Sequence, residues 1–262
     1  MSLLHEIIEH QKEVVQQKKR IITTAKIRQS AETKKPSVPF LQSIFQSNQL
    51  SIIAEMKKKS PSAGLFMDDY RPESIAKLYE ASGASALSVL TEEKYFSGNV
   101  EHIQFAQKNC NLPILRKDFI VDPYQIYEAK VFGASAVLLI IAALPHDLYA
   151  DLLKLVYEIQ LDALVEVHSE KELETALKYS PKVIGINNRN LADLTISLNI
   201  TNQLVYKIPK GVCIVSESGI QTPETIRQLK ERGVHAALIG ESLLKKYPDM
   251  QLLKSFVQAG RS

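Results

Sequence analysis

Residues 51–90 read SIIAEMKKKSPSAGLFMDDYRPESIAKLYEASGASALSVL and contain one full repeat of the pattern that decides the fold. SIIAEMK is a short apolar run of β-type residues, PESIAKLYEASG is an amphipathic helical stretch, and SALSVL is the next β-type run. The first run ends unusually, because Glu55 and Lys57 stand where a buried strand should carry apolar side chains. The fold depends on how often this pattern recurs, and the function depends on what these charges do.

The same alternation continues to the end of the chain. Its β-type runs are SIIAEMK, SALSVL, PILRKDF, SAVLLII, ALVEVH, KVIGINN, VCIVSES and AALIG. Amphipathic stretches such as PYQIYEAKVFGA and PETIRQLKERG separate them. Several runs are almost wholly apolar, as parallel strands covered on both faces are. Eight such units in a chain of 262 residues predict a (β/α)8 barrel of the TIM type, in the α/β class.

A doubly wound open sheet is the alternative fold. It is disfavoured because no Gly-x-Gly-x-x-Gly follows any β-type run and because the units are evenly spaced. We expect residues 1–262 to form a single barrel domain, of which residues 1–48 are an N-terminal helical extension. Apolar pairs from Leu3/Leu4 to Ile21/Ile22 recur there at spacings of four and seven, which predicts an amphipathic helix. A short coiled coil would look similar, but the pattern stops at KKPSVPF, which favours a helix packed on its own barrel.

The composition excludes several classes of function. The chain is 45% hydrophobic and 23% charged, which is ordinary for a globular protein. Its net charge of +3 is spread along the chain, so we expect no nucleic-acid partner, although a small anion remains a possible ligand. Two cysteines, Cys110 and Cys213, are too few for a disulfide framework or a cysteine-rich metal site and suit a reducing cytosol.

Targeting and metal motifs are also missing from the sequence. The N-terminus has no basic segment followed by an apolar one, and the longest apolar run, AVLLIIAAL at residues 136–144, is too short to span a bilayer. We therefore expect a cytoplasmic protein with no membrane partner. The histidines do not group, so no metal site is expected, and no nucleophile elbow indicates Ser-His-Asp chemistry.

Polar and charged residues gather at the ends of the predicted strands, where barrel enzymes have their active sites. They are Glu55, Lys57, Lys117, Glu166, His168, Asn187, Asn188, Arg189, Ser216, Glu217, Ser218, Gly219, Gly240 and Glu241. Any one of them could be a solvated strand end or part of a buried ion pair. The collection favours an active site, because burying an unpaired Lys or Glu costs several kcal/mol. Neighbouring charges can also set the pKa values of a lysine acid and a glutamate base for work at neutral pH.

Three turns after these strands have the composition of an anion site. Ser218-Gly219 and Gly240-Glu241-Ser242 stand where barrels often hold a phosphate with backbone N–H groups. SPSAG, residues 60–64, adds hydroxyl groups and the rigid Pro61 as a third wall. Because a carboxylate repels a phosphate, we expect the Glu241 side chain to point away.

The strand-end motifs, taken together, resemble the indole-3-glycerol phosphate synthase family of tryptophan biosynthesis. The motifs that carry the resemblance are EMKKKSPS, ALSVLTEEKYFSG, LRKDFI, LVEVH, GINNRNL, SESGI and IGESL, in this order. The resemblance runs from about Leu50 to Leu244, and the N-terminal helix is similar to that family's extension.

This resemblance implies a reaction and a set of roles. The implied reaction is ring closure of 1-(2-carboxyphenylamino)-1-deoxyribulose 5-phosphate, with loss of carbon dioxide and water, and it implies no metal and no organic cofactor. By resemblance, Lys117 is the general acid at the ribulose carbonyl, and Glu166 assists dehydration as acid or base with Lys57 as partner. Which lysine serves which step stays open.

The resemblance also implies the residues that surround the substrate. Glu55, Asn187 and Glu217 would lie around the reacting sugar, and Arg189 near the anthranilate carboxylate. The implied apolar pocket for the aromatic ring consists of Phe96, Phe119, Leu138 and Leu191. The implied phosphate site consists of Ser60, Ser218, Gly219, Gly240 and Glu241.

Three other readings of the sequence stay open. One is another phosphate-binding barrel, such as a phosphoribosylanthranilate isomerase, and another is a Schiff-base aldolase that uses Lys57 or Lys117. The third is a non-catalytic barrel, which would be expected to lack a catalytic residue, whereas both lysines and Glu166 are present. The oligomeric state is not readable from the sequence, and a monomer is favoured.

Overall fold

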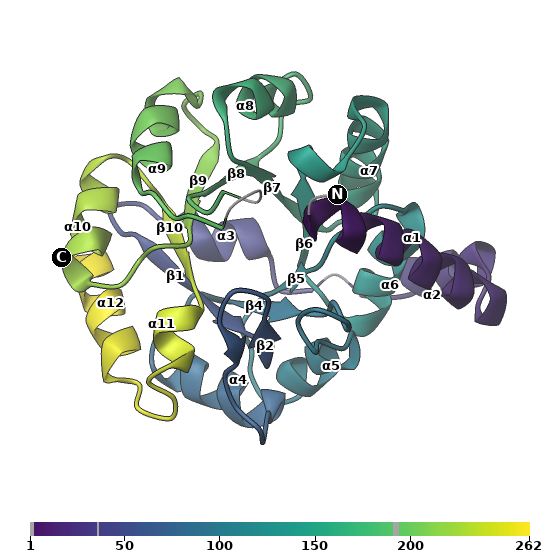
Figure 1. Cartoon of the computed structure of the whole chain (residues 1–262), viewed down its shortest axis with the longest axis horizontal. Coiled ribbons are helices and arrows are strands. Elements are labelled where there is room, and N and C mark those ends of the chain that lie inside the picture. Colours follow the sequence, from purple (N-terminus) through teal and green to yellow (C-terminus); the bar gives the residue numbers. More distant parts are fainter. Residues whose placement is uncertain (1–2, 36, 191–193) are drawn as a thin grey trace.

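A closed ring of eight parallel strands forms the centre of the computed structural model, which describes residues 3–35, 37–190 and 194–262 (Figure 1). The strands are β1 (Ser51–Met56), β4 (Ala86–Leu90), β5 (Ile114–Lys117), β6 (Ala136–Ile140), β7 (Asp162–Val167), β8 (Val183–Asn187), β9 (Cys213–Glu217) and β10 (Ala236–Ile239). The first strand pairs with the last, and Ser51 lies opposite Ala236. The expected (β/α)8 barrel is therefore confirmed, and the open sheet is excluded.

Helices follow the strands and surround the ring (Figure 1). They are α4 (Pro72–Ala81), α5 (Glu101–Gln107), α6 (Pro123–Phe132), α7 (His146–Glu158), α8 (Glu170–Leu177), α9 (Asn199–Leu204), α10 (Pro223–Glu231), α11 (Glu241–Leu244) and α12 (Gln251–Arg261). The barrel also contains two short 3-10 turns, η1 (Ile141–Ala143) and η2 (Val205–Lys207). A two-stranded hairpin of β2 (Lys59–Ser60) and β3 (Gly64–Leu65) follows β1. Proline opens α4, α6 and α10, where its fixed φ suits the first helical turn.

The amphipathic helix that the apolar pairs predicted is confirmed as α1 (Leu3–Ile21), and two shorter helices, α2 (Thr24–Glu32) and α3 (Phe40–Ile44), follow it in the N-terminal segment. Thr23 is extended, and its side-chain oxygen accepts the N–H of Lys26 at 3.3 Å, which starts the second helix. Because the first helix ends at this point, Ile21 is 84% exposed although the pattern assigned it to the apolar face.

The first two helices pack on the barrel's own helix α6. Val15 and Ile27 join Tyr124 and Tyr127 in one apolar cluster, as expected for a helix that covers its own barrel. An ion pair also joins α1 to α6: Lys18 Nζ lies 2.9 Å from Glu128 Oε1. The other oxygen of Glu128 lies 2.8 Å from Arg116 Nη2, and Arg116 is 1% exposed on β5.

Helix α3 closes the amino-terminal end of the barrel and is visible within the ring of strands in Figure 1. Phe40 and Ile44 are fully buried against inward-facing residues such as Ile53 and Leu164. The carboxylate of Asp162, at the start of β7, accepts the N–H of Leu41 at 2.8 Å. The lower barrel is therefore filled with apolar side chains, and the inward polar residues lie at the other end.

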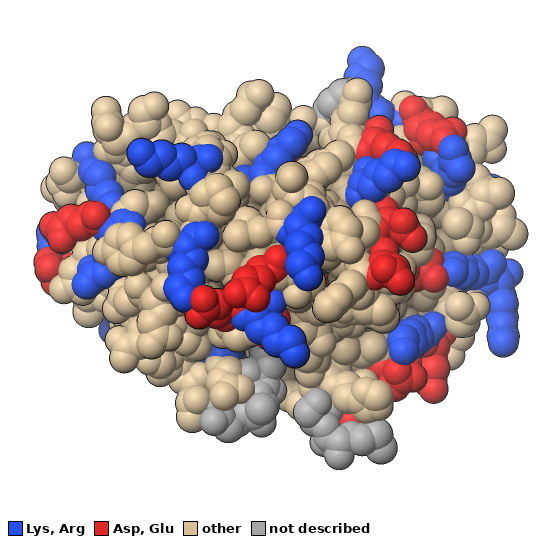
Figure 2. Space-filling model, turned by 90° about the horizontal axis from the view of Figure 1, so that it is seen from above, with Lys and Arg blue, Asp and Glu red and all other residues tan. Residues whose placement is uncertain are grey.

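The surface carries both signs of charge. Figure 2 shows Lys and Arg side chains interspersed with Asp and Glu across one face of the molecule. This distribution agrees with the small net charge of +3. On the visible face, no concentrated positive field is present of the kind that binds nucleic acid.

Candidate active site

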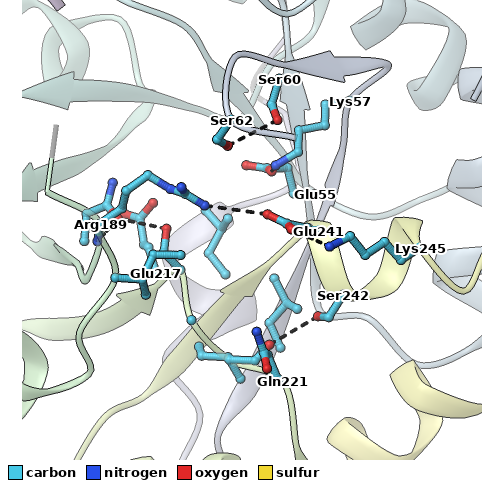
Figure 3. Close-up of a pocket in the computed structure, with 18 of the residues that line it drawn as sticks. Glu55, Lys57, Ser60, Ser62, Arg189, Glu217, Gln221, Glu241, Ser242 and Lys245 are labelled. Carbon is cyan, nitrogen blue, oxygen red and sulfur yellow. Dashed lines mark hydrogen bonds and ion pairs between the residues drawn. The ribbon is translucent and has the colours of Figure 1, made fainter. Parts of the chain in front are cut away.

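A cavity of about 460 Å³ opens at the carboxyl ends of the strands (Figure 3). Strand ends and the turns after β1, β8, β9 and β10 line it. The lining residues that the sequence predicted are Glu55, Lys57, Ser60, Lys117, Asn187, Arg189, Glu217, Ser218, Gly219, Gly240 and Glu241. The side chains alternate along each strand, so the last inward positions of several strands meet at this end of the ring.

Lys117 connects two glutamates at the base of this cavity. Its Nζ lies 2.9 Å from Glu166 Oε2 and 2.6 Å from Glu217 Oε2. The three residues come from β5, β7 and β9, and the two glutamate side chains are only 2% exposed. Glu166 is not among the residues that line the cavity and contacts it through Lys117. One ammonium group therefore serves two buried carboxylates.

The two carboxylates that share Lys117 have different surroundings. Burial opposes ionisation of Glu166, but Lys117 and His168 outweigh it and hold the Glu166 pKa well below its usual range. Asn187 Nδ2 also donates to Glu166 Oε1 at 3.2 Å. Burial raises the pKa of Glu217 to about 7 in spite of Lys117, and Glu217 Oε1 has no hydrogen-bond partner among the described residues. At neutral pH Glu166 is therefore a carboxylate, whereas Glu217 can carry a proton.

Lys117 itself is held in its charged form. Burial would lower the pKa of its ammonium group, but Glu166, Glu217 and Glu55 together keep that pKa above its ordinary value. The protonated amine is a hydrogen-bond donor, and it can act as an acid toward an oxygen that enters the cavity.

Glu55 and Lys57 form a second charged pair on the first strand. Lys57 Nζ lies 2.5 Å from Glu55 Oε1 and 5.4 Å from the centre of the Phe66 ring. Gly240 leaves room for this carboxylate, because a Cβ added at Gly240 would lie 2.3 Å from Glu55 Oε1. The charges that end the first apolar run therefore face the cavity together, as the barrel prediction required.

The turns after β2 and β9 supply hydroxyl groups and backbone with left-handed φ angles to the cavity. Ser218 and Gly219 have left-handed φ angles of 67° and 79°. Ser218 Oγ donates to Asn187 Oδ1 at 2.9 Å. Across the cavity, Ser60 Oγ accepts the N–H of Ala63 at 3.2 Å and so fixes the turn after β2. Ser60, Ser218 and Gly219 therefore line the cavity with uncharged polar groups.

Glu241 does not point away from the cavity, so that expectation was wrong. Its Oε2 lies 3.6 Å from Arg189 Nη2 and its Oε1 lies 2.7 Å from Lys245 Nζ (Figure 3). The hydrogen bond from Lys245, aided by the charges of Lys57 and Arg189, lowers the pKa of Glu241. The carboxylate turns inward because these three cations surround it.

None of the described residues that were predicted to form the apolar pocket lines this cavity. Phe96 and Phe119 have ring centres 6.2 Å apart, and Leu138 is buried in the barrel interior. Pro61 is exposed and likewise does not line the cavity. Leu191 lies outside the described residues.

Two residues at this end of the barrel make contacts that the sequence did not predict. Glu92 accepts the backbone N–H groups of Lys94, Tyr95 and Phe96 at 3.1, 2.7 and 3.1 Å, so it fixes the turn that carries Phe96. Its only signal in the sequence is its position just after a β-type run. His168 does not group with the other histidines, and its two ring nitrogens contact the carboxylates of Glu166 and Glu172.

The part of the chain that the structure describes has neither a candidate metal site nor a candidate membrane span. No group of three or more His, Cys, Asp or Glu residues in that part could hold a metal ion. Among the same residues, no helix combines the length and the apolar character needed to cross a membrane.

Comparison with known proteins gives a consistent result. A family model described as "Indole-3-glycerol phosphate synthase" matches residues 4–256. A protein of that name from Thermoanaerobacter pseudethanolicus is 43% identical over 259 residues, covering 99% of this chain and 98% of its own length. Another from a Polaromonas species is 41% identical and covers 93% of this chain and 94% of its own length.

Solved structures support the fold alone. A structure titled "Native KDPGal structure" superposes with a TM-score of 0.59 at 16% identity, covering 82% of this chain and 97% of the other. A designed cube-shaped protein cage matches with a TM-score of 0.58, also at 16% identity, covering 81% of this chain and 72% of the other.

Proposed function

Because the chain belongs to the indole-3-glycerol phosphate synthase family, we propose that its cavity closes the indole ring of 1-(2-carboxyphenylamino)-1-deoxyribulose 5-phosphate. The reaction releases carbon dioxide and water and gives indole-3-glycerol phosphate. The observation that carries this proposal is the triad of Lys117, Glu166 and Glu217 at the base of the cavity. It unites one protonated amine, one carboxylate and one carboxyl group that can hold a proton.

The chemistry of ring closure explains why such a triad is needed. The substrate loses a carboxylate as neutral carbon dioxide, so each turnover takes up one proton. The ring carbon attacks the carbonyl carbon, the carbonyl oxygen must be protonated as this bond forms, and the resulting hydroxyl group must later leave as water. Before the indole is complete, a proton must also leave the carbon that joins the new double bond. The site therefore needs proton donors and a base close together.

We assign these roles from the surroundings of each group. Lys117 donates to the ribulose carbonyl oxygen, because its ammonium is held charged and reaches the cavity. Glu166 acts as the base, since Lys117 and His168 keep it ionised. Glu217 holds the proton that each turnover takes up. Glu55 and Lys57 form a second acid–base pair that can help the hydroxyl group leave.

The remaining residues would bind the substrate. Ser60, Ser218, Gly219 and Gly240 would hold the phosphate through hydroxyl and backbone N–H groups. Arg189 would pair with the anthranilate carboxylate after leaving Glu241, and Asn187 would orient the sugar. The aromatic ring would pack near Phe96, Phe119, Leu138 and Leu191, with Pro61 at the rim.

A Schiff-base aldolase is the weaker alternative. Such an enzyme needs an unprotonated lysine as nucleophile. Lys117 is paired with two carboxylates that raise its pKa, and Lys57 is paired with Glu55. Trapping with borohydride in the presence of substrate would separate the two: an adduct on either lysine would favour the aldolase.

The direct test is turnover. The purified protein is incubated with 1-(2-carboxyphenylamino)-1-deoxyribulose 5-phosphate, and indole fluorescence is followed with time. We expect fluorescent product to form without an added cofactor. A folded protein that forms no product would overturn the proposal.

A further inference from the structure

His168 bridges two carboxylates directly behind the base of the cavity. It follows the last residue of β7, and its side chain is 11% exposed. Its Nε2 lies 3.2 Å from Glu166 Oε1, and its Nδ1 lies 3.1 Å from Glu172 Oε2 on α8. The backbone N–H of His168 donates to the same Glu172 oxygen at 2.8 Å. Glu172 thus holds the histidine in place from the outer side.

The partners of the imidazole decide where its protons lie. Nδ1 faces an oxygen of Glu172, so it carries hydrogen and donates. Nε2 faces Glu166 Oε1, which already accepts from Asn187, while Glu166 Oε2 accepts from Lys117. Both oxygens of Glu166 therefore face donors, and a proton on Glu166 would point at an N–H group. Nε2 lies 3.2 Å from Glu166 Oε1 without hydrogen-bond geometry among the described residues, so this contact is electrostatic, and the two flanking carboxylates favour the imidazolium form of the ring.

The other charges around the pair agree with this assignment. Lys117 and Glu217 face Glu166 from β5 and β9, and the uncharged Asn187 faces it from β8. On the outer side, a cavity of about 410 Å³ is lined by His168 together with Glu170 on α8 and Lys207 on η2. Lys207 forms an ion pair with Glu170, so the two charges offset each other.

The titration of His168 points the same way. Burial would lower the pKa of His168, but its contacts with the carboxylates of Glu166 and Glu172 raise it to about 10. The positive charge of the ring therefore lies between the two carboxylates at neutral pH.

We propose that His168, held by Glu172, is a positioning residue that fixes Glu166 as an oriented carboxylate and thereby makes Glu166 the base of the site. This inference rests on the proposed function and deepens it, because sequence resemblance leaves Glu166 as either acid or base. It also explains why two carboxylates that share one lysine differ. Glu166 has a second cation beside it, whereas Glu217 has only Lys117 at hydrogen-bond distance among the described residues.

Two variants of His168 separate its charge from its shape. In His168→Asn the amide nitrogen can take the place of Nδ1 and keep Glu172, but nothing reaches Glu166. In His168→Gln the longer side chain can place an uncharged donor near Glu166. We expect His168→Asn to lower kcat by about 10- to 100-fold through misplacement of the base, with KM changed by less than about threefold. His168→Gln should recover part of this loss.

The supporting residue has a matched control on the same helix. Glu172→Gln should also lower kcat, because the ring loses its outer carboxylate. Glu174→Gln alters an exposed glutamate of α8 and should leave kcat at the wild-type value. Thermal unfolding of each variant checks that the fold is intact. A loss of kcat that is equal in His168→Asn and His168→Gln and follows loss of thermal stability would indicate a purely structural role and overturn the proposal.

A second readout does not depend on turnover. Nuclear magnetic resonance of ¹⁵N-histidine-labelled protein reports the protonation of each ring, and the His168 signal is assigned from its absence in His168→Gln. We expect an imidazolium at pH 8, and a lower pKa in Glu166→Gln. A ring that is neutral at pH 7 would overturn the proposal even if His168→Asn fails to fold, because the assignment needs only His168→Gln. Failure of the wild-type protein to form product would instead overturn the proposed function and leave this measurement valid.

Discussion

Lys117 is the counter-ion of two buried carboxylates, so its removal should affect both reaction and stability. For Lys117→Met we expect kcat to fall by about 10²- to 10⁴-fold, as for loss of a general acid. The free energy of unfolding at neutral pH should fall by about 3 kcal/mol, because buried charges lose their partner. Turnover assays and urea denaturation measure the two effects. Lys154→Met, at a lysine with 76% side-chain exposure, is the control, and a Lys117→Met variant with more than a tenth of wild-type activity would contradict the assignment.

Glu217 should make stability depend on pH in an unusual direction. Burial raises its folded-state pKa to about 7 from an ordinary 4.5, so the stability that its protonated form contributes is lost as the pH rises through 7. Glu217→Gln does not titrate at this position. We therefore expect the free energy of unfolding of the variant, relative to that of wild type, to be about 1–3 kcal/mol higher at pH 9 than at pH 5. The variant should also lose activity. Urea denaturation at both pH values measures this, and a difference that does not change with pH would speak against a raised pKa.

The contact between α1, α6 and β5 connects the N-terminal helix to the interior through one glutamate. Glu128 pairs with Lys18 on one side and with the buried Arg116 on the other. For Glu128→Gln we expect a loss of about 3–5 kcal/mol in the free energy of unfolding, since among the described residues Arg116 then keeps only Asp118 as a carboxylate partner.

Chemical denaturation of Glu128→Gln and of the control Glu158→Gln tests this expectation. Glu158 pairs with an exposed lysine at 3.7 Å, so its loss should change stability by less than about 1 kcal/mol. Burial would raise the pKa of Glu128, but Arg116 and Lys18 lower it, so its stabilising effect should disappear as the pH falls below about 4.5. Equal effects of the two substitutions would show that the buried contact adds nothing.

The elements themselves were largely predictable, because each strand and helix is encoded by a local periodicity. All eight β-type runs became barrel strands, and the amphipathic stretches between them that begin with proline became the helices α4, α6 and α10. The shorter helix α2 was not predicted, because it lies beyond the last apolar pair of the pattern and begins with the capping hydrogen bond of Thr23. Glu241 was misjudged because its partners Arg189 and Lys245 are brought together by the fold.

The chemistry within the site was less predictable than its location. The sequence places Lys117, Glu166 and Glu217 at strand ends, but only the register of the ring decides that one lysine serves both glutamates. The spacing of His168 and Glu172 by four residues could have suggested a contact. The position of His168 Nε2 beside Glu166, on which its proposed role depends, is set by the backbone at the end of β7 and could not be predicted from the sequence.

The whole molecule should be a monomer in solution. Its large exposed apolar residues, such as Ile21, Leu65, Phe105 and Tyr206, come from four different elements. Stable dimers bury larger apolar surfaces. Static light scattering should therefore give a mass near 29.4 kDa across a range of concentrations, and a mass twice as large would contradict this expectation. That the extension and the barrel form one domain stays a prediction, which a single cooperative unfolding transition would support.

The pairing of β1 with β10 has a consequence for how the protein is made. During synthesis β1 leaves the ribosome early, but Ala236, which pairs with Ser51, follows only near the end of the chain. Until then the nascent chain keeps the edges of β1 and β9 unpaired, and such edges promote aggregation. A protein that ends at His235 should therefore be cut rapidly by proteases and should self-associate, whereas the full chain resists both. The last strand of the barrel therefore controls when these exposed edges disappear, because β10 joins β9 to β1 and closes the ring.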